Sequence, residues 1–155
     1  MSDPQNNIGK ICKSLEKYFD AGAGRVRVKS RPVLIIGCEQ NYTSPSDVDY
    51  EILPISKIDN FEPDEDFDVL LDEEDIQELS LHQVSYIRTH KTTWNHCRHM
   101  RVEDPIGDLK STFPEKFDEI ILKNHEWVLS RTNRVVSKKI KVEISEEEYI
   151  DDLSF

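Results

Sequence analysis

Residues 25–36 read RVRVKSRPVLII. The first five alternate charged and β-branched side chains, which predicts a half-buried strand or one arm of a hairpin. Residues 32–36 form the longest apolar run of the chain and predict a buried strand. The preceding residues 20–24, DAGAG, predict a flexible turn. Together these patterns indicate that β-structure organises the fold.

Further strands are indicated downstream of this stretch. Residues 40–49 are rich in Ser, Asn, Thr, Asp and Pro and predict a loop. Residues 50–55 predict a strand, which Pro54 places near a sheet edge or a bulge. Residues 84–89 and the segment that follows up to Met100 predict two more short strands.

The two ends of the chain give different patterns. Apolar residues of the segment 8–19 recur at helical spacing, although a strand over 9–13 remains open as an alternative. Near the C-terminus, Ile140, Val142 and Ile144 alternate with polar residues and predict a closing strand.

One helix is predicted with a clear start. Residues 112–115, TFPE, have the pattern of a capping box with proline in the first turn. The helix expected at about 113–130 places five apolar residues on one face: Phe117, Ile120, Ile121, Val128 and Leu129. We therefore expect an α+β, mainly β fold, in which helices pack on a small twisted barrel.

The negative charge of the chain is concentrated in two segments. The formal net charge is −11, but Asp59 to Glu78 holds 11 acidic residues and no Lys or Arg. Residues 143–155 hold 6 more acids and no base. The remaining 122 residues carry a charge of +6, so a basic body is hidden in the average.

The chain of 155 residues has the length of one ordinary domain. We expect a single domain over 1–142 with an exposed acidic insertion at about 59–80, and an acidic tail at 143–155. Within the insertion, residues 72–79 are expected to form one or two helical turns. The insertion is further expected to lie near the basic body and to compete with nucleic acid as an electrostatic brake, the alternative being a solvated loop that aids solubility.

Composition also bears on where the protein works. No apolar run approaches the roughly 20 residues that cross a bilayer, and no signal peptide is apparent at the start. The three cysteines are too few and too scattered for a disulfide framework, so we expect reduced thiols. These observations predict a cytoplasmic protein without a membrane partner.

Three segments, in this order, resemble the PemK/MazF family of toxins. Residues 29–36, KSRPVLII, resemble an early strand of the family, and residues 51–56, EILPIS, resemble a strand that ends in a small hydroxyl residue. Residues 85–91, SYIRTHK, together with Ile106 to Leu109 and the helix that follows, resemble a block near the family's C-terminal end.

The resemblance implies a small SH3-like β-barrel that forms a homodimer and cuts single-stranded RNA without a metal or other cofactor. It further implies neutralisation by a small acidic antitoxin protein, as in toxin–antitoxin systems. Arg31 and Ser56 fall on positions where the family carries catalytic residues. Some relatives carry an acidic residue just before the matching Arg-Thr, where this chain has Ser85 and Tyr86.

Residue chemistry fits these positions. Metal-free RNA cleavage uses the 2′-hydroxyl as nucleophile and requires proton transfer and donors for the charge of the phosphorane. An Arg is always charged and donates in a planar fork, and a Ser hydroxyl can donate to the same phosphate. His90 is the candidate for the missing base, since unperturbed imidazole titrates near neutrality.

Other residues are candidates for RNA contact. Arg88, Thr89 and Lys91 are expected to contact RNA, the alternative for Arg88 and Thr89 being a structural pair or an interface. Trp94 can stack a splayed base, the alternative being a core or interface position. The run His96-Cys97-Arg98-His99 invites a metal interpretation, but adjacent strand residues point to opposite faces, so no metal site is expected.

The sequence thus favours a metal-independent endoribonuclease that acts on single-stranded RNA. A different class is the main alternative, a catalytically inactive binding protein that presents its acidic segments to a basic partner. A third option is an acidic DNA-mimic inhibitor of a nucleic-acid enzyme.

Overall fold

The computed structural model describes residues 3–131. The strand expected at 140–144 and the acidic tail at 143–155 lie outside the described residues. The strands are β1 (Lys10–Asp20), β2 (Arg25–Cys38), β3 (Asp49–Lys57), β4 (Asp68–Leu71), β5 (Ser85–Arg88), β6 (Thr93–His96) and β7 (Gly107–Asp108). The helices are α1 (Glu73–Glu78), α2 (Leu109–Thr112) and α3 (Pro114–Ser130), with short 3₁₀ turns at Pro4–Asn7, Ile58–Asn60 and Cys97–His99.

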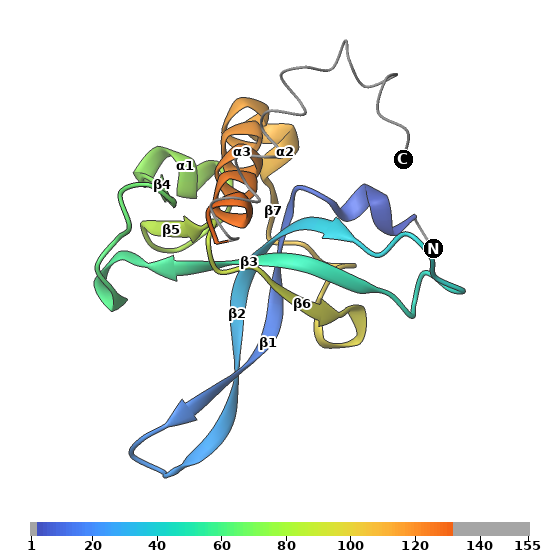
Figure 1. Cartoon of the computed structure of the whole chain (residues 1–155), viewed down its shortest axis with the longest axis horizontal. Coiled ribbons are helices and arrows are strands. Elements are labelled where there is room, and N and C mark those ends of the chain that lie inside the picture. Colours follow the sequence, from blue (N-terminus) through green and yellow to red (C-terminus); the bar gives the residue numbers. More distant parts are fainter. Residues whose placement is uncertain (1–2, 132–155) are drawn as a thin grey trace, which may run out of the picture.

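The strands form one antiparallel sheet of seven strands in the order β4-β5-β3-β2-β1-β7, and β6 pairs with β3 beside this path. The sheet curls around α2 and α3, so the molecule has the form of a half-barrel with helices against it (Figure 1). The prediction of an α+β, barrel-like fold is confirmed at this level. No helix among the described residues is long and apolar enough to span a membrane.

The N-terminal segment is a strand and not a helix. β1 pairs with β2 in continuous register from Ile11↔Leu34 to Asp20↔Arg25, so the backbone groups that face β2 have partners along the whole strand. The predicted turn joins the two strands. There the Asp20 carboxylate accepts hydrogen bonds from the backbone N–H groups of Gly22 and Ala23, and Gly24 adopts a φ of +64° that favours glycine.

The core lies on both faces of the sheet, because strand residues alternate in direction. On one face Leu34 and Leu53 pack with the buried Phe117 and Ile120 of α3. On the other face Val33, Ile35, Tyr50 and Ile52 form a second cluster with Cys12 and Met100. All three cysteines are free, and burial raises the pKa of the Cys12 thiol to about 12.

β3 lies inside the sheet, so Pro54 does not mark an edge strand; of the two expected settings, the structure has the irregular one, with a register shift between Ile35 and Gly37 opposite Ile52 and Glu51 of β3. Pro54 pairs with Val33 of β2 on one side. On the other side β3 pairs with β6 as far as Ile52 and with β5 from Ile55 onward. The proline therefore stands where β3 changes partner, a position at which its missing N–H removes no ladder hydrogen bond.

The acidic segment is not a simple exposed insertion. Its second half forms β4 and α1, and Val69, Leu71 and Leu79 are buried in the core. The prediction of a short helix at 72–79 is confirmed by α1. Several carboxylates serve the fold, since Asp72 and Asp75 form a capping box at the start of α1.

The predicted helix at about 113–130 is confirmed by α3, but its predicted capping box is wrong. Phe113 is the N-cap and makes no side-chain cap bond, while Pro114 occupies the first turn. Thr112 instead ends the short helix α2, which is capped by Asp108 through a hydrogen bond from Ser111 N to Oδ1 of 3.1 Å. A cap requires extended backbone, and Thr112 is helical.

Candidate nucleic-acid groove

A groove opens where β2 and β3 part. The two strands pair from Cys38↔Tyr50 to Val33↔Pro54. Beyond that point β2 continues beside β1, and Ile55 to Lys57 of β3 turn to β5. A depression of about 540 Å³ lies in this fork, with Arg31 and Pro32 on one side and Ile55 and Ser56 on the other. We call it the fork groove.

The lining of the fork groove is basic. No Asp or Glu lines it among the described residues. Its cationic or potentially cationic side chains come from four separate segments: Lys13, Lys29, Arg31, Lys57 and His82. The remaining wall consists of uncharged residues, among them Ser80, Leu81, Gln83 and Ile106. Such a site concentrates positive potential and suits a polyanion.

Arg31 is half-buried in this wall, and no carboxylate of the described residues pairs with its guanidinium. Its guanidinium carbon lies 5.9 Å from the centre of the Tyr18 ring. Within residues 3–131 it forms no salt bridge, whereas Arg27 on the same strand pairs with Asp20 at 3.1 Å. The guanidinium donors of Arg31 therefore remain available to a ligand.

Ser56 faces the same groove from β3. It is half-buried and stands opposite Tyr86 in the register with β5. The structure thus brings Arg31 and Ser56, which are 25 residues apart in the chain, into one depression. A guanidinium and a hydroxyl that line one depression from two sides can both donate to the oxygens of a phosphate bound between them.

Arg88 lies outside the fork groove, in a cluster between β4, β5 and the following loop. Its Nε donates to Asp68 Oδ1 at 3.2 Å, and the Asp68 side chain is 0 % exposed. The guanidinium also stacks on the Phe61 ring, 4.0 Å from its centre. Arg88 is therefore committed to a buried partner, as in the structural alternative for this residue.

Thr89 and Asn124 connect this cluster to α3. The Thr89 hydroxyl donates to the Phe67 carbonyl at 2.6 Å, and the Thr89 side chain is fully buried. Asn124 of α3 donates to the Thr89 carbonyl at 2.9 Å and to Thr92 Oγ1 at 2.7 Å. A buried Thr with these partners holds the helix against the sheet. The burial of Thr89 favours the structural alternative over a contact with RNA.

His90 belongs to the same cluster and does not line the fork groove. Its buried Nδ1 has no hydrogen-bond partner and lies 3.7 Å from Asp68 Oδ1, while Nε2 lies 3.5 Å from Arg88 Nη2. Burial lowers the pKa of His90 below 6.5, and Arg88 and Lys91 act in the same direction against Asp68 and Asp64. His90 therefore does not line the groove that contains Arg31 and Ser56, and its assignment as the base stays a prediction.

Lys91 and Trp94 also stand apart from the fork groove. Lys91 is exposed in the turn after β5, where its N–H donates to the Arg88 carbonyl at 3.2 Å. Trp94 is 54 % exposed on β6, opposite Glu51 at the other end of β3 from Ser56. Trp94 is thus not a core residue, and neither side chain contributes to the fork groove.

Sequence reasoning missed His82, Lys57 and Lys13 as groove residues. Lys57 follows Ser56 directly, and Lys13 stands opposite Pro32 in the β1–β2 register. Both lysines could in principle have been predicted as groove residues from the pairing of the strands. His82 is exposed in the loop between α1 and β5, and no local pattern marks it.

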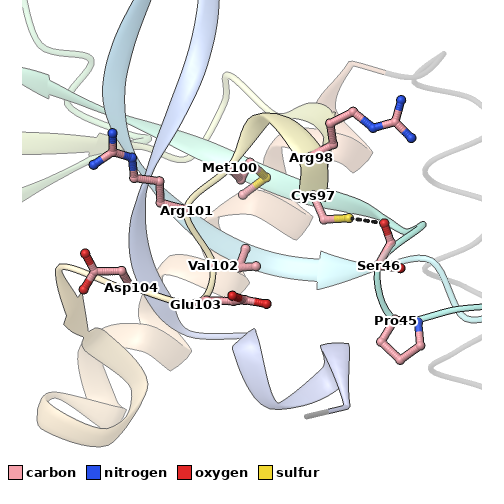
Figure 2. A pocket seen from close by; sticks show the side chains of 9 residues that line it. All are labelled: Pro45, Ser46, Cys97, Arg98, Met100, Arg101, Val102, Glu103 and Asp104. Carbon is pink, nitrogen blue, oxygen red and sulfur yellow. Dashed lines mark hydrogen bonds between the residues drawn. The ribbon is translucent and has the colours of Figure 1, made fainter. Parts of the chain in front are cut away.

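A second depression of about 360 Å³ lies beside the 3₁₀ turn at Cys97–His99 (Figure 2). The Cys97 thiol donates to the Ser46 carbonyl at 3.2 Å, and Arg98, Arg101, Glu103 and Asp104 line the same depression. His96 Nδ1 accepts from Arg98 N at 3.0 Å while Nε2 contacts Asp47 Oδ1 at 2.9 Å, so this histidine is held by the turn itself. Among the described residues no group of three or more His, Cys, Asp or Glu side chains is placed to hold a metal.

Compared with known proteins, the sequence matches no family model and no curated protein.

Proposed function

We propose that this protein is a metal-independent endoribonuclease toxin of the PemK/MazF type, with an SH3-like barrel, that cleaves single-stranded RNA in the fork groove. The observation that carries the proposal is the meeting of Arg31 and Ser56 in one basic groove. The resemblance points to the same two residues independently of their positions in space, and they come from different strands. An acid-free, cation-lined groove of this size supports a phosphodiester substrate.

The proposed reaction is an internal transfer. The 2′-oxygen of the ribose attacks the adjacent phosphorus and the 5′-oxygen leaves, which yields a 2′,3′-cyclic phosphate and a 5′-hydroxyl. Arg31 donates its fork to the non-bridging oxygens, where negative charge increases in the phosphorane, and Ser56 donates to the same group. Lys13, Lys29 and Lys57 hold the neighbouring phosphates of the strand.

Proton transfer in this scheme falls to His82. It is exposed and it is the histidine that the fork groove contains, whereas His90 is enclosed by Asp68 and Arg88. Imidazole is the side chain most often used to take and return protons in enzymes. His82 therefore takes the place that the sequence assigned to His90, and it accepts the 2′ proton or protonates the leaving oxygen.

The decisive experiment incubates the purified protein with a long single-stranded RNA in excess EDTA. Cleavage is expected to persist and to leave a cyclic or 3′-phosphate on one fragment and a 5′-hydroxyl on the other. Arg31→Ala should abolish it without a change in the circular dichroism spectrum. Loss of cleavage on chelation, with rescue by zinc or magnesium, would contradict the metal-free assignment.

The resemblance also supports a homodimer and a small acidic antitoxin as partners. Two-fold dimers are the commonest oligomers, and a groove at a fork of strands can be extended by a second copy. Light scattering at micromolar concentration is expected to give twice the chain mass of 18.1 kDa. A mass of one chain would reject the dimer.

The second candidate function is a binding protein that presents its acidic surface to a basic partner. It is favoured by one observation: eight of the 11 acids in residues 59–78 are exposed, namely Asp59, Glu62, Glu65, Asp66, Asp72, Glu73, Glu74 and Glu78. The same EDTA assay separates the two functions, because a binding protein leaves the RNA intact. A DNA-mimic inhibitor would in addition bind a DNA-binding protein and not RNA.

A further inference from the structure

β1 and β2 extend beyond the rest of the sheet as a two-stranded arm (Figure 1). We define the arm as residues 15–30, which pair only with each other beyond the body of the sheet apart from a hydrogen bond from Asn95 to the Leu15 carbonyl. Two-stranded ribbons are marginally stable in water unless something covers one face. The arm is therefore a place to look for a binding partner.

The two faces of the arm differ in chemistry. On one face, Arg25, Arg27 and Lys29 alternate with Glu16, Tyr18 and Asp20 of the opposite strand. The other face carries four large apolar side chains in register: Leu15 is 48 % exposed, Phe19 67 %, Val26 63 % and Val28 58 %. Exposed apolar side chains gathered on one face mark an interaction surface.

This apolar face runs without a break into the fork groove. Strand alternation places Lys13 and Pro32 on the same face as Leu15 and Val28, and both line the groove. The edge of β2 over residues 25–32 also has no strand partner among the described residues. An open edge next to an apolar face accepts an added extended segment.

The occupant must be acidic as well as apolar. Residues 13–31 contain six basic and two acidic side chains. Lys13 and Lys17 flank the apolar residues on their own face, and neither forms a salt bridge within residues 3–131. Electrostatic complementarity then favours a segment that alternates carboxylates with large apolar side chains.

The chain contains such a segment outside the described residues. Residues 143–155 read EISEEEYIDDLSF, with six acids, no base and five large apolar residues. The 11 residues between Arg131 and this segment can span about 36–40 Å when extended, comparable with the diameter of a domain of this size. The segment can therefore reach the arm from the end of α3.

We infer that residues 143–155 dock on the apolar face of the arm along the open edge of β2, with carboxylates on Lys13 and Lys17. This contact does not depend on the proposed nuclease activity, because it rests on the arm and the charge of the segment alone. Tethering gives the segment an effective concentration in the millimolar range, so a weak contact suffices.

The test is zero-length carbodiimide cross-linking of the full chain, followed by peptide mapping. Carboxylates of residues 143–155 are expected to link to Lys13 or Lys17, with at least fivefold higher yield than to the exposed Lys110 of α2. A mixture of nitrogen-15-labelled and unlabelled chains shows whether each link joins one chain or two. Links spread evenly over all lysines, or no links to the arm, would overturn the inference.

Two full-length variants sharpen the result. Phe19→Ser with Val28→Ser removes apolar surface from the arm and should lower the yield of these links at least fivefold. Leu122→Ser removes an equally exposed leucine from α3 and should leave the yield unchanged. Links that join only labelled to unlabelled chains would assign the arm to a second copy and reject the intrachain contact. RNA cleavage enters none of these readouts, so a failure here is separate from a failure of the nuclease.

Discussion

The fork groove and the Arg88–His90 cluster contain the same kinds of side chain and use them in opposite ways. Arg31 stands in a groove that no carboxylate of residues 3–131 lines, whereas Arg88 donates to the buried carboxylate of Asp68. Ser56 borders open space, whereas Thr89 is fully buried and bonded to the Phe67 carbonyl. The contrast shows that a basic or hydroxyl side chain is available for a ligand only when the fold has not already supplied its partner.

Removal of Arg31 should have the largest effect. Arg31→Ala is expected to lower the rate of RNA cleavage by roughly 100- to 1,000-fold, the range found when one donor to a developing oxyanion is lost. Arg27→Ala is the matched control, since Arg27 is on the same strand and face but pairs with Asp20. Single-turnover cleavage measures both. Equal losses in the two variants would mean that the groove has no special role.

Removal of Arg88 should affect the stability of the fold and not the chemistry of RNA cleavage. Arg88→Ala leaves the Asp68 carboxylate buried without its cation, which costs about 3 kcal/mol of unfolding free energy. Arg31→Ala should change that free energy by less than about 0.5 kcal/mol, since it breaks no salt bridge. Urea titration followed by circular dichroism gives both values. A stable Arg88→Ala protein that has lost cleavage would reverse the assignment of the two clusters.

The two histidines provide a third test. His82→Gln should lower the cleavage rate by about 100-fold, the usual contribution of a proton-transferring side chain. His90→Gln should leave cleavage within about threefold of the parent as long as the protein is folded, because surface and structural changes away from the reacting atoms act mainly on stability. A large loss in the His90 variant alone would restore the assignment made from the sequence.

The smallest expected effect is a pH dependence of stability. Because burial lowers the pKa of His90 in the folded protein, the unfolded chain binds this proton at a higher pH. The contribution of neutral His90 to the free energy of unfolding is therefore complete above about pH 6.5. It is lost as the pH falls below that value. Replacing His90 with Gln should flatten the stability profile between about pH 7 and pH 5 relative to the parent. Identical profiles in urea titrations across this range would show that His90 is not involved.

Much of the sheet followed from the sequence. The alternation at 25–29, the apolar run at 32–36 and the glycine turn at 20–24 predicted β2 and its hairpin, because local patterning and backbone freedom determine these elements. The segment 8–19 was ambiguous because its apolar residues fit both the helical and the strand periodicity. The pairing with β2 decided in favour of a strand. Long-range pairing of this kind is not visible in one segment.

The candidate site was predictable only in part. Arg31 and Ser56 were named from the sequence, but their meeting depends on where β2 and β3 separate, which is a property of the whole sheet. His90 was misplaced because its neighbour Asp68 is 22 residues away in a segment that acidic composition alone describes as an exposed insertion. The carboxylates of Asp75 and Asp68 are buried in the fold, so the electrostatic brake expected in this segment has fewer exposed acids to act with.

The fork of β2 and β3 determines where the chain tolerates insertions. Side-chain direction alternates along a strand, so the insertion of one residue between Arg31 and Val33 would turn Arg31 away from the groove while leaving every residue type in place. Two residues added at the tip of the hairpin, in 21–23, would preserve that direction and lengthen only the arm. Length variation among functional relatives should therefore gather at the hairpin tip and avoid the three residues that precede Leu34.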